Sequence, residues 1–181
     1  MPGGGIGVPL VAPYIPDMGG LVSSRAASGW TRSRRSLWTV KRHEALAQLS
    51  RDHHQALFQA QRLRRASDED AAEVKAGFLD FWRSVGHLHF RAEEEVLLPA
   101  YAAYADASDD AVVRVLVDHT LIRRDADALE EAGLERVHEL GDRLEAHVRH
   151  EERVLFPLIE QALPDDELVR VARRVDEVER G

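Results

Sequence analysis

The sequence predicts an all-α protein: an up-down-up-down four-helix bundle with a short C-terminal helix and a disordered N-terminal tail. Apolar residues recur at three- and four-residue steps in four long segments. Residues typical of helix starts or of chain breaks separate these segments, and no segment shows the alternation of a strand. The hydrophobic content of 44% is enough for one packed core.

The tail is expected at residues 1–36. This part holds most of the Gly and Pro residues, contains Asp17 as its only acid, and keeps no helical or strand period. Its basic residues follow its apolar stretch, which is the wrong order for a secretory signal. Such a composition predicts a disordered or non-domain tail. The domain is then expected at residues 37–181, with its core at 40–163.

The first helix should carry an inward stripe with a histidine in it. The stripe consists of Leu46, Leu49, His53, Ala56, Ala60 and Leu63. His53 stands where an apolar residue is expected, and His54 is turned about 100° away from it. Because apolar helix faces are wide, we favour His53 as the inward residue and keep His54 as the alternative.

The second helix contains two polar residues in its stripe. We expect Ser67 to be its N-cap, with acids in the first turn. The depths of His53 and His89 would then differ by about 12 Å, so either the helix begins nearer Glu73 or its first turns overhang the bundle. The stripe consists of Phe78, Trp82, Val85, His89, Glu93, Val96 and Ala100.

Two further long helices and a short one are predicted. Ser108 is the expected cap of the third helix, whose stripe is Val112, Leu116, His119, Ile122, Ala126 and Leu129. Gly133 should interrupt the pattern before the fourth helix, whose stripe is Val137, Leu140, Leu144, His147, Glu151, Val154 and Leu158. A C-terminal helix should follow Pro164 and pack on the bundle through Leu168, Val171, Val175 and Val178.

One motif occurs twice. His89–Pro99 reads HFRAEEEVLLP and His147–Pro157 reads HVRHEERVLFP, with seven of eleven positions identical. A His and a Glu four residues apart project from the same face of a helix. Two such helices facing each other would supply two His and two Glu to one cavity, as in dinuclear sites of helical bundles.

The candidate metal site therefore has six ligands, namely His53, His89, Glu93, His119, His147 and Glu151. Glu93 and Glu151 are the natural bridges between two ions. Since the chain has no Cys, any metal site must use imidazole and carboxylate groups. These groups suit iron, with manganese or zinc as alternatives.

The residues next to the motif's first Glu should have supporting roles. Glu94 and Glu152 are expected either to bond to the ligands from outside or to face solvent. Arg91 and Arg149 repeat with them and are expected as their ion-pair partners.

Charge and hydropathy exclude two classes of partner. The formal net charge of −8 argues against nucleic acid. No apolar run approaches the roughly 18 residues of a membrane span. The sequence alone does not predict an oligomeric state.

The segments LSRDHHQAL, HFRAEEEVLLP, DHTLIRR and HVRHEERVLFP together resemble the hemerythrin-like (HHE cation-binding) domain, over about residues 40–163. The resemblance implies a non-haem di-iron centre, with the four His as terminal ligands and the two Glu as bridges. It also implies a cytoplasmic protein that binds oxygen, senses oxygen or iron, or handles nitric oxide or peroxide.

One position departs from the oxygen-carrying members, which have a second His four residues after that of the third helix. Here that residue is Arg123, which cannot bind a metal, and this favours sensing, iron handling or redox chemistry over oxygen carriage. An enzyme that reduces peroxide or nitric oxide with electrons from an external donor is the alternative function. A structural bundle with incidental His residues is a third reading, which metal analysis would separate from both.

Overall fold

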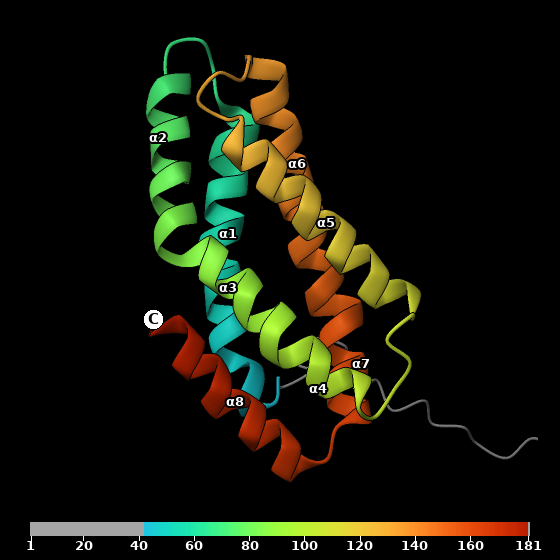
Figure 1. Cartoon of the computed structure of the whole chain (residues 1–181). Coiled ribbons are helices and arrows are strands. Elements are labelled where there is room, and N and C mark those ends of the chain that lie inside the picture. The colour runs from blue at the N-terminus through green and yellow to red at the C-terminus, as the bar shows by residue number, and fades with distance from the viewer. Residues whose placement is uncertain (1–41, 181) are drawn as a thin grey trace, which may run out of the picture. The chain divides into compact units, whose positions relative to one another are not determined.

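The computed structural model describes residues 42–180, and all regular structure in this range is helical (Figure 1). The predicted all-α class is therefore confirmed. The expected N-terminal tail lies outside the described residues.

Five helical rods make up the described chain. The first is a 3₁₀ turn that leads into α1, and the last is α8. The second and fourth rods are continuous, but π turns, in which an N–H bonds to the carbonyl five residues back, divide each of them into several elements. The rods are η1 (Glu44–Leu46) with α1 (Ala47–Arg65); α2 (Ala71–Phe81), η2 (Trp82–Gly86), α3 (His87–Ala92), η3 (Glu93–Leu97) and α4 (Leu98–Ala102); α5 (Asp110–Asp127); α6 (Leu134–His150), η4 (Glu151–Leu155) and α7 (Phe156–Ala162); and α8 (Asp165–Glu179).

The two serines expected as N-caps do not cap their helices. Ser67 instead donates hydrogen bonds from its N–H and its hydroxyl to Oδ1 of Asp70, at 2.6 and 2.8 Å, and α2 begins only at Ala71. The start nearer Glu73 was thus the better alternative. In α5 the cap is Asp109, whose side chain accepts a hydrogen bond from the N–H of Ala111. Both serines lie in the turn before the helix; Asp109 takes the capping role in α5, whereas Asp70 before α2 makes no side-chain cap hydrogen bond.

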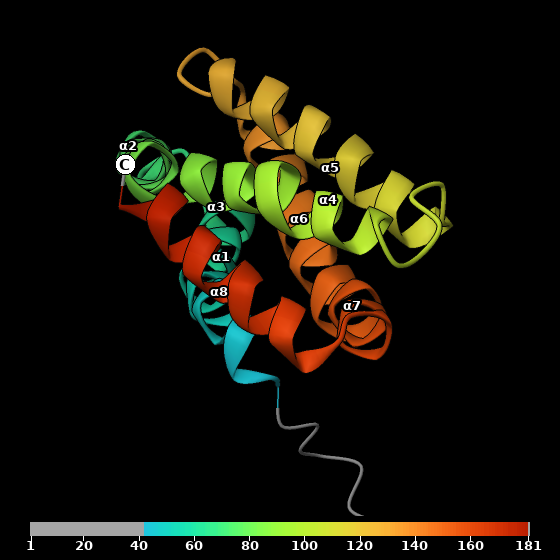
Figure 2. The same cartoon turned by 60° about the horizontal axis from the view of Figure 1, so that its bottom comes forward.

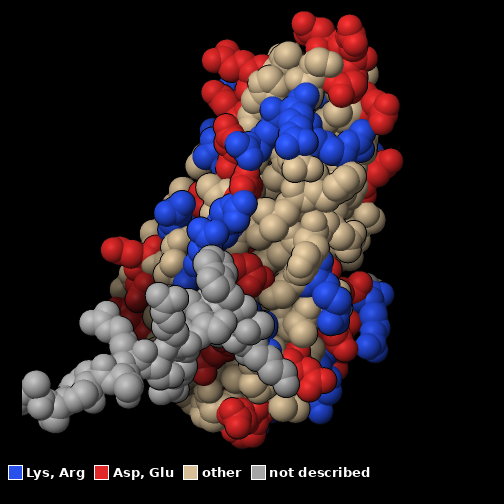
Figure 3. Space-filling model, turned by 180° about the vertical axis from the view of Figure 1, so that it is seen from behind, with Lys and Arg blue, Asp and Glu red and all other residues tan. Residues whose placement is uncertain are grey.

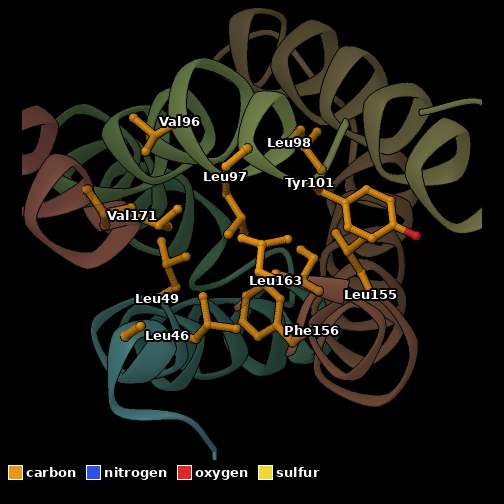
Figure 4. Close-up of a cluster of buried hydrophobic side chains, with 14 of the residues drawn as sticks. Leu46, Leu49, Val96, Leu97, Leu98, Tyr101, Leu155, Phe156, Leu163 and Val171 are labelled. Carbon is orange, nitrogen blue, oxygen red and sulfur yellow. The ribbon is translucent and has the colours of Figure 1, made fainter. Parts of the chain in front are cut away.

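The apolar core consists of two clusters with the polar candidate residues between them. On every long rod the candidate residues are preceded by side chains of one cluster and followed by side chains of the other. Figure 4 shows the cluster nearest the C-terminal helix, where Leu46, Leu97 and Phe156 point toward one another. The second cluster surrounds Phe78 and Leu140. Apolar layers above and below therefore keep water away from the polar layer.

A glycine allows two of the rods to approach closely. A Cβ added at Gly141 of α6 would lie 2.9 Å from the carbonyl oxygen of Ala60 and 2.9 Å from the backbone nitrogen of Arg64. α1 and α6 form the most extensive helix pair, and each carries one candidate His. The contact therefore brings together the two helices that carry His53 and His147.

The π turns shift the apolar stripe predicted for the fourth helix. Val154 is 40% exposed, whereas Leu155 and Ile159 are fully buried in place of the predicted Val154 and Leu158. In η4 the N–H of Phe156 bonds to the carbonyl of Glu151, five residues back. This wider turn accommodates one extra residue, so every later residue is rotated relative to an α-helical stripe.

The stripe of the third helix was also wrong at one position. Val115 is fully buried and Leu116 is 41% exposed. From Val112 the buried residues follow at steps of three and then four, to Val115 and His119. The sequence pattern does not distinguish this from steps of four and then three, which would bury Leu116.

The described surface combines charged and uncharged areas. On the face opposite to that of Figure 1, groups of charged side chains border a wide uncharged area (Figure 3). None of the helices between residues 42 and 180 has both the length and the apolar composition needed to cross a membrane.

Candidate metal centre

The structure brings all six predicted ligands together in the interior. At most 5% of any of these residues is exposed. They come from all four long rods and form two groups that share two members, the carboxylates of Glu93 and Glu151. We call His53 and His89 with these carboxylates the first group, and His119 and His147 with the same carboxylates the second group.

In the first group the imidazoles meet at their Nε2 atoms. The Nε2 atoms of His53 and His89 lie 3.1 Å apart. Nε2 of His53 is 3.1 Å from Oε2 of Glu151, and Nε2 of His89 is 3.4 Å from Oε1 of Glu93. Four ligand atoms thus face a common point.

The second group repeats this arrangement. Nε2 of His119 lies 3.3 Å from Oε2 of Glu93 and 3.7 Å from Oε1 of Glu151. Nε2 of His147 lies 3.2 Å from Oε2 of Glu151. Both carboxylates therefore face imidazoles of both groups, the position expected of bridging ligands.

Several atoms of these residues are buried without a hydrogen-bond partner in the described part of the chain. One is Nδ1 of His147, on the outer side of the ring; those that face the two groups are both carboxylate oxygens of Glu93, both of Glu151, and the Nε2 atoms of His119 and His147. Leaving charged groups buried and unpaired is costly. A cation at each group would satisfy these atoms, and nitrogen with oxygen donors and no sulfur suits iron, manganese or zinc. The residues therefore fit a metal centre.

His54 does not take part in the cluster. It is exposed, and its Nδ1 lies 2.8 Å from the carbonyl oxygen of Ser50 in its own helix. Of the two adjacent histidines, it is His53 that the structure turns inward.

The outer nitrogen of His53 bonds to the second Glu of the second repeat. Nδ1 of His53 lies 2.7 Å from Oε1 of Glu152, to which the hydroxyl of Ser50 also donates. Arg42 donates to Oε2 of Glu152 at 2.7 Å and to its carbonyl oxygen at 2.8 Å. That carbonyl is available because Pro157, five residues later, has no N–H to donate.

The outer nitrogen of His119 bonds in the same way to the second Glu of the first repeat. Nδ1 of His119 lies 2.7 Å from Oε1 of Glu94. Arg123 donates to both oxygens of Glu94, at 2.8 and 2.9 Å, in a bidentate pair. Glu94 and Glu152 thus bond to the His residues from outside, one of the two roles expected for them.

The predicted ion-pair partners of these acids were wrong. Arg91 pairs with Glu95 instead, at 3.0 Å, and Arg149 pairs with Glu145. Both pairs join residues four apart on the surface of one helix, where long side chains reach each other readily.

The other two His residues face aspartates that sequence reasoning missed. Nδ1 of His89 lies 3.4 Å from Oδ2 of Asp52, and Nδ1 of His147 lies 4.0 Å from Oδ2 of Asp118, beyond hydrogen-bond distance. A signal was present, since each Asp directly precedes one of the two single His residues. Asp52, Glu94, Asp118 and Glu152 are called the outer carboxylates below.

Two aromatic rings were also missed. Phe90 stacks on His119, with ring centroids 3.7 Å apart, and Phe156 stacks on His53, with centroids 5.3 Å apart. Both rings occur at positions where the two repeats differ: Val148 of the second repeat matches Phe90, and Leu98 of the first repeat matches Phe156. The rings limit the movement of one His in each group.

Protonation differs strongly within the second group. Burial lowers the pKa of His119, but the surrounding carboxylates outweigh this effect and raise that pKa to about 10. For His147, burial dominates and lowers the pKa to about 4. His147 is therefore neutral at pH 7, the form that binds metals.

The outer Glu residues are fully ionised at neutral pH. Burial raises the pKa of Glu94, but hydrogen bonds from His119 and Arg123 lower it to about 2. The pKa of Glu152 is likewise about 2, because the hydrogen bonds from His53, Ser50 and Arg42 outweigh burial. Each can accept a hydrogen bond from an Nδ1–H group. The lone pair of Nε2 in that imidazole is then directed at the centre.

An apolar cavity adjoins the cluster. It reaches His53, His89 and His147, and its remaining wall consists mainly of Ala56, Phe81, Trp82, Val85, Phe90, Leu144 and Val148. Such a lining admits small uncharged molecules more readily than charged ones.

The comparison with protein families agrees with this geometry. The model described as the hemerythrin HHE cation binding domain matches residues 45–159, more than half of the chain. Comparisons with curated proteins and with solved structures gave no match.

Proposed function

We propose, from the premise that the chain belongs to the hemerythrin HHE cation binding domain family, that its buried cluster holds two non-haem iron ions and binds or senses a small ligand. Dioxygen, nitric oxide or peroxide is the class of ligand proposed. The observation that carries the proposal is the sharing of Glu93 and Glu151 by two groups of buried ligand atoms.

The ligand assignment follows from the groups. His53 and His89 would hold one ion and His119 and His147 the other, with Glu93 and Glu151 as bridges. The donor set favours iron, with manganese or zinc as the alternatives. We also infer an up-down-up-down bundle for the four long rods, because helices on all sides then supply the side chains of one internal site.

When bound, iron supplies redox chemistry and positions at which a small ligand can bind. The protein supplies orientation and exclusion of water. Three of the outer carboxylates, those of Asp52, Glu94 and Glu152, bond to Nδ1 of an imidazole, so that its Nε2 faces inward. The cavity supports a small, uncharged ligand, because its lining is apolar apart from Asp52 and the three His residues that it reaches.

Arg123 bears on which function is proposed. Its guanidinium is fully engaged with Glu94, so the second group gains no ligand from this helix beyond His119. Two His and two shared carboxylates leave positions open at each ion. This supports sensing or redox chemistry, and it also supports the alternative of an enzyme that reduces peroxide or nitric oxide with an external electron donor. The cytoplasmic location stays a prediction from the family resemblance.

The test is the metal content of the purified full-length chain, with optical spectra recorded before and after exposure to air. We expect about two irons per chain and a spectrum that changes with air. The exposed Glu95→Ala variant is the control and should match the wild type. A chain that binds no metal, or that binds one ion and has a spectrum that does not change with air, would contradict the proposal. Peroxide or nitric oxide turnover well above that of free iron would favour the enzyme.

A further inference from the structure

α5 turns a row of apolar side chains to solvent. Val113 and Val117 are 46% and 51% exposed, the half-buried Leu121 continues the row, and Leu116 flanks it at 41% exposed. Residues four apart form one ridge of a helix. In Figures 1 and 2 α5 lies at the edge of the molecule.

Two of the charges on this face are placed symmetrically about Val117, and a third, Arg114, pairs with Asp118 of its own helix at 3.7 Å. Asp110 lies seven residues before it and Arg124 seven residues after it. A second α5 running antiparallel would place Asp110 opposite Arg124, Val113 opposite Leu121, and Val117 opposite its own copy. A parallel partner would instead bring like charges together, which costs free energy.

The charged ends of this face are available for such a contact. Asp110, the first residue of α5, is exposed. Arg124 pairs only with the adjacent Asp125, and its side chain remains 59% exposed. Exposed ion pairs of this kind contribute little and exchange easily.

We propose that this face of α5 is the interface of a two-fold symmetric homodimer, with the two α5 helices antiparallel and the axis at Val117. In a symmetric interface of this type the same surface must complement itself, and the pattern around Val117 does so. One helix from each chain buries less than the roughly 1,600 Å² of a standard interface, so we expect a reversible dimer.

The first test is sedimentation of the full-length chain over a wide range of concentrations. The wild type should shift from monomer to dimer as concentration rises. Val117→Glu places two carboxylates on the axis and should give a monomer throughout. Val169→Glu is the matched control, because Val169 of α8 is 63% exposed and should tolerate the change. A wild type that stays monomeric, or a dimer that survives Val117→Glu, overturns the proposal.

Cross-linking tests the position of the axis. The chain has no Cys, so Val117→Cys introduces a single thiol. Mild oxidation should convert most of this variant into a disulfide-linked dimer. Val113→Cys should react more slowly, because its thiol faces Leu121, and Val169→Cys should stay monomeric. Equal reaction of all three variants would mean random collision.

A charge exchange tests the orientation. Asp110→Arg alone and Arg124→Asp alone should each weaken the dimer, while the double variant should restore it. Far-ultraviolet circular dichroism should show an unchanged helix content in each variant. Failure of the double variant to recover would exclude the antiparallel arrangement.

Discussion

The first and second groups of the candidate metal centre share two carboxylates but differ in their outer support. In each group one His is held tightly, by Glu152 or by Glu94, at 2.7 Å. The other His of the first group has Asp52 within hydrogen-bond distance, whereas His147 of the second group has no outer partner there. The second group thus combines one strongly basic imidazole with one weakly basic imidazole, while the pKa values of both first-group imidazoles are raised.

This difference shows that the same inner ligand set can be prepared for a cation in two ways. In the first group, burial lowers the pKa values of both His residues but the neighbouring carboxylates raise them further, so protons compete with a metal at both. In the second group, His147 is neutral beforehand. The groups should therefore respond differently to substitutions and to pH.

The largest loss of bound metal is expected from removing the two carboxylates that both groups share. Glu93→Ala/Glu151→Ala removes the carboxylates that both groups share, so binding of both ions should be lost completely. Metal analysis of the purified variant is the measurement, with Glu95→Ala as the control. Retention of one ion would show that the groups are independent.

Removal of one His should separate the groups. His53→Ala should abolish the ion of the first group, and His147→Ala that of the second, so each variant should retain about one ion per chain. His54→Ala should retain both, because His54 lies on the surface. If His54→Ala loses an ion and His53→Ala does not, the assignment of the first helix is wrong.

The way in which the stability of the metal-free chain changes with pH should reveal the protonation of His147. Its pKa is depressed from 6.5 to about 4, because burial penalises its charged form. Its contribution to stability is therefore complete above pH 6.5 and is lost as pH falls through 4, a change of about 3 kcal/mol. Denaturant unfolding at pH 7 and pH 4, after chelation, is the measurement.

A matched pair of variants isolates this contribution. His147→Asn should lose less stability than the wild type over that interval, while the surface substitution His54→Asn should behave like the wild type. The prediction fails if His147→Asn and the wild type lose the same amount.

The smallest effects should come from the outer carboxylates. Glu94→Gln and Glu152→Gln weaken the bonds that orient His119 and His53, so cation affinity should fall by roughly 10- to 100-fold. Asp118→Asn should change it far less, since Asp118 lies 4.0 Å from His147. Calorimetric titration of the chelated protein with Fe²⁺ under anaerobic conditions measures this order. An equal loss in all three variants would remove the proposed difference in outer support.

The sequence predicts the inner cluster better than its surroundings. A His and a Glu four apart share a helix face whatever the rest of the fold does, so four of the six residues could be placed together in advance. His53 and His119 could be added because each interrupts an apolar stripe. The partners of Glu94 and Glu152 could not, because Arg42 and Arg123 are brought there by packing. Asp52 and Asp118 were overlooked although each precedes a single His, since they point to the neighbouring helix rather than along the stripe.

Local backbone geometry explains the remaining differences. A period of 3.6 residues cannot anticipate the π turns at Glu93 and Glu151, so Val154 was placed inside and Leu155 was not. The prolines at the end of each repeat were a signal, because a residue without an N–H disturbs the α-helical bonding before it. Helix starts depended on one or two residues, the scale at which sequence patterns are least informative.

The outer bonds of Glu94 and Glu152 cross between the two halves of the chain. His53 precedes the first repeat but is held by Glu152 of the second, whereas His119 precedes the second repeat but is held by Glu94 of the first. Neither half alone contains His53 or His119 together with the Glu that bonds to its Nδ1. Residues 42–102 and 110–162, produced as separate fragments, would therefore have to reassociate to rebuild the centre. Two similar halves that bond across to each other are also what would result if a helical hairpin paired with its own copy and the two copies were joined in one chain.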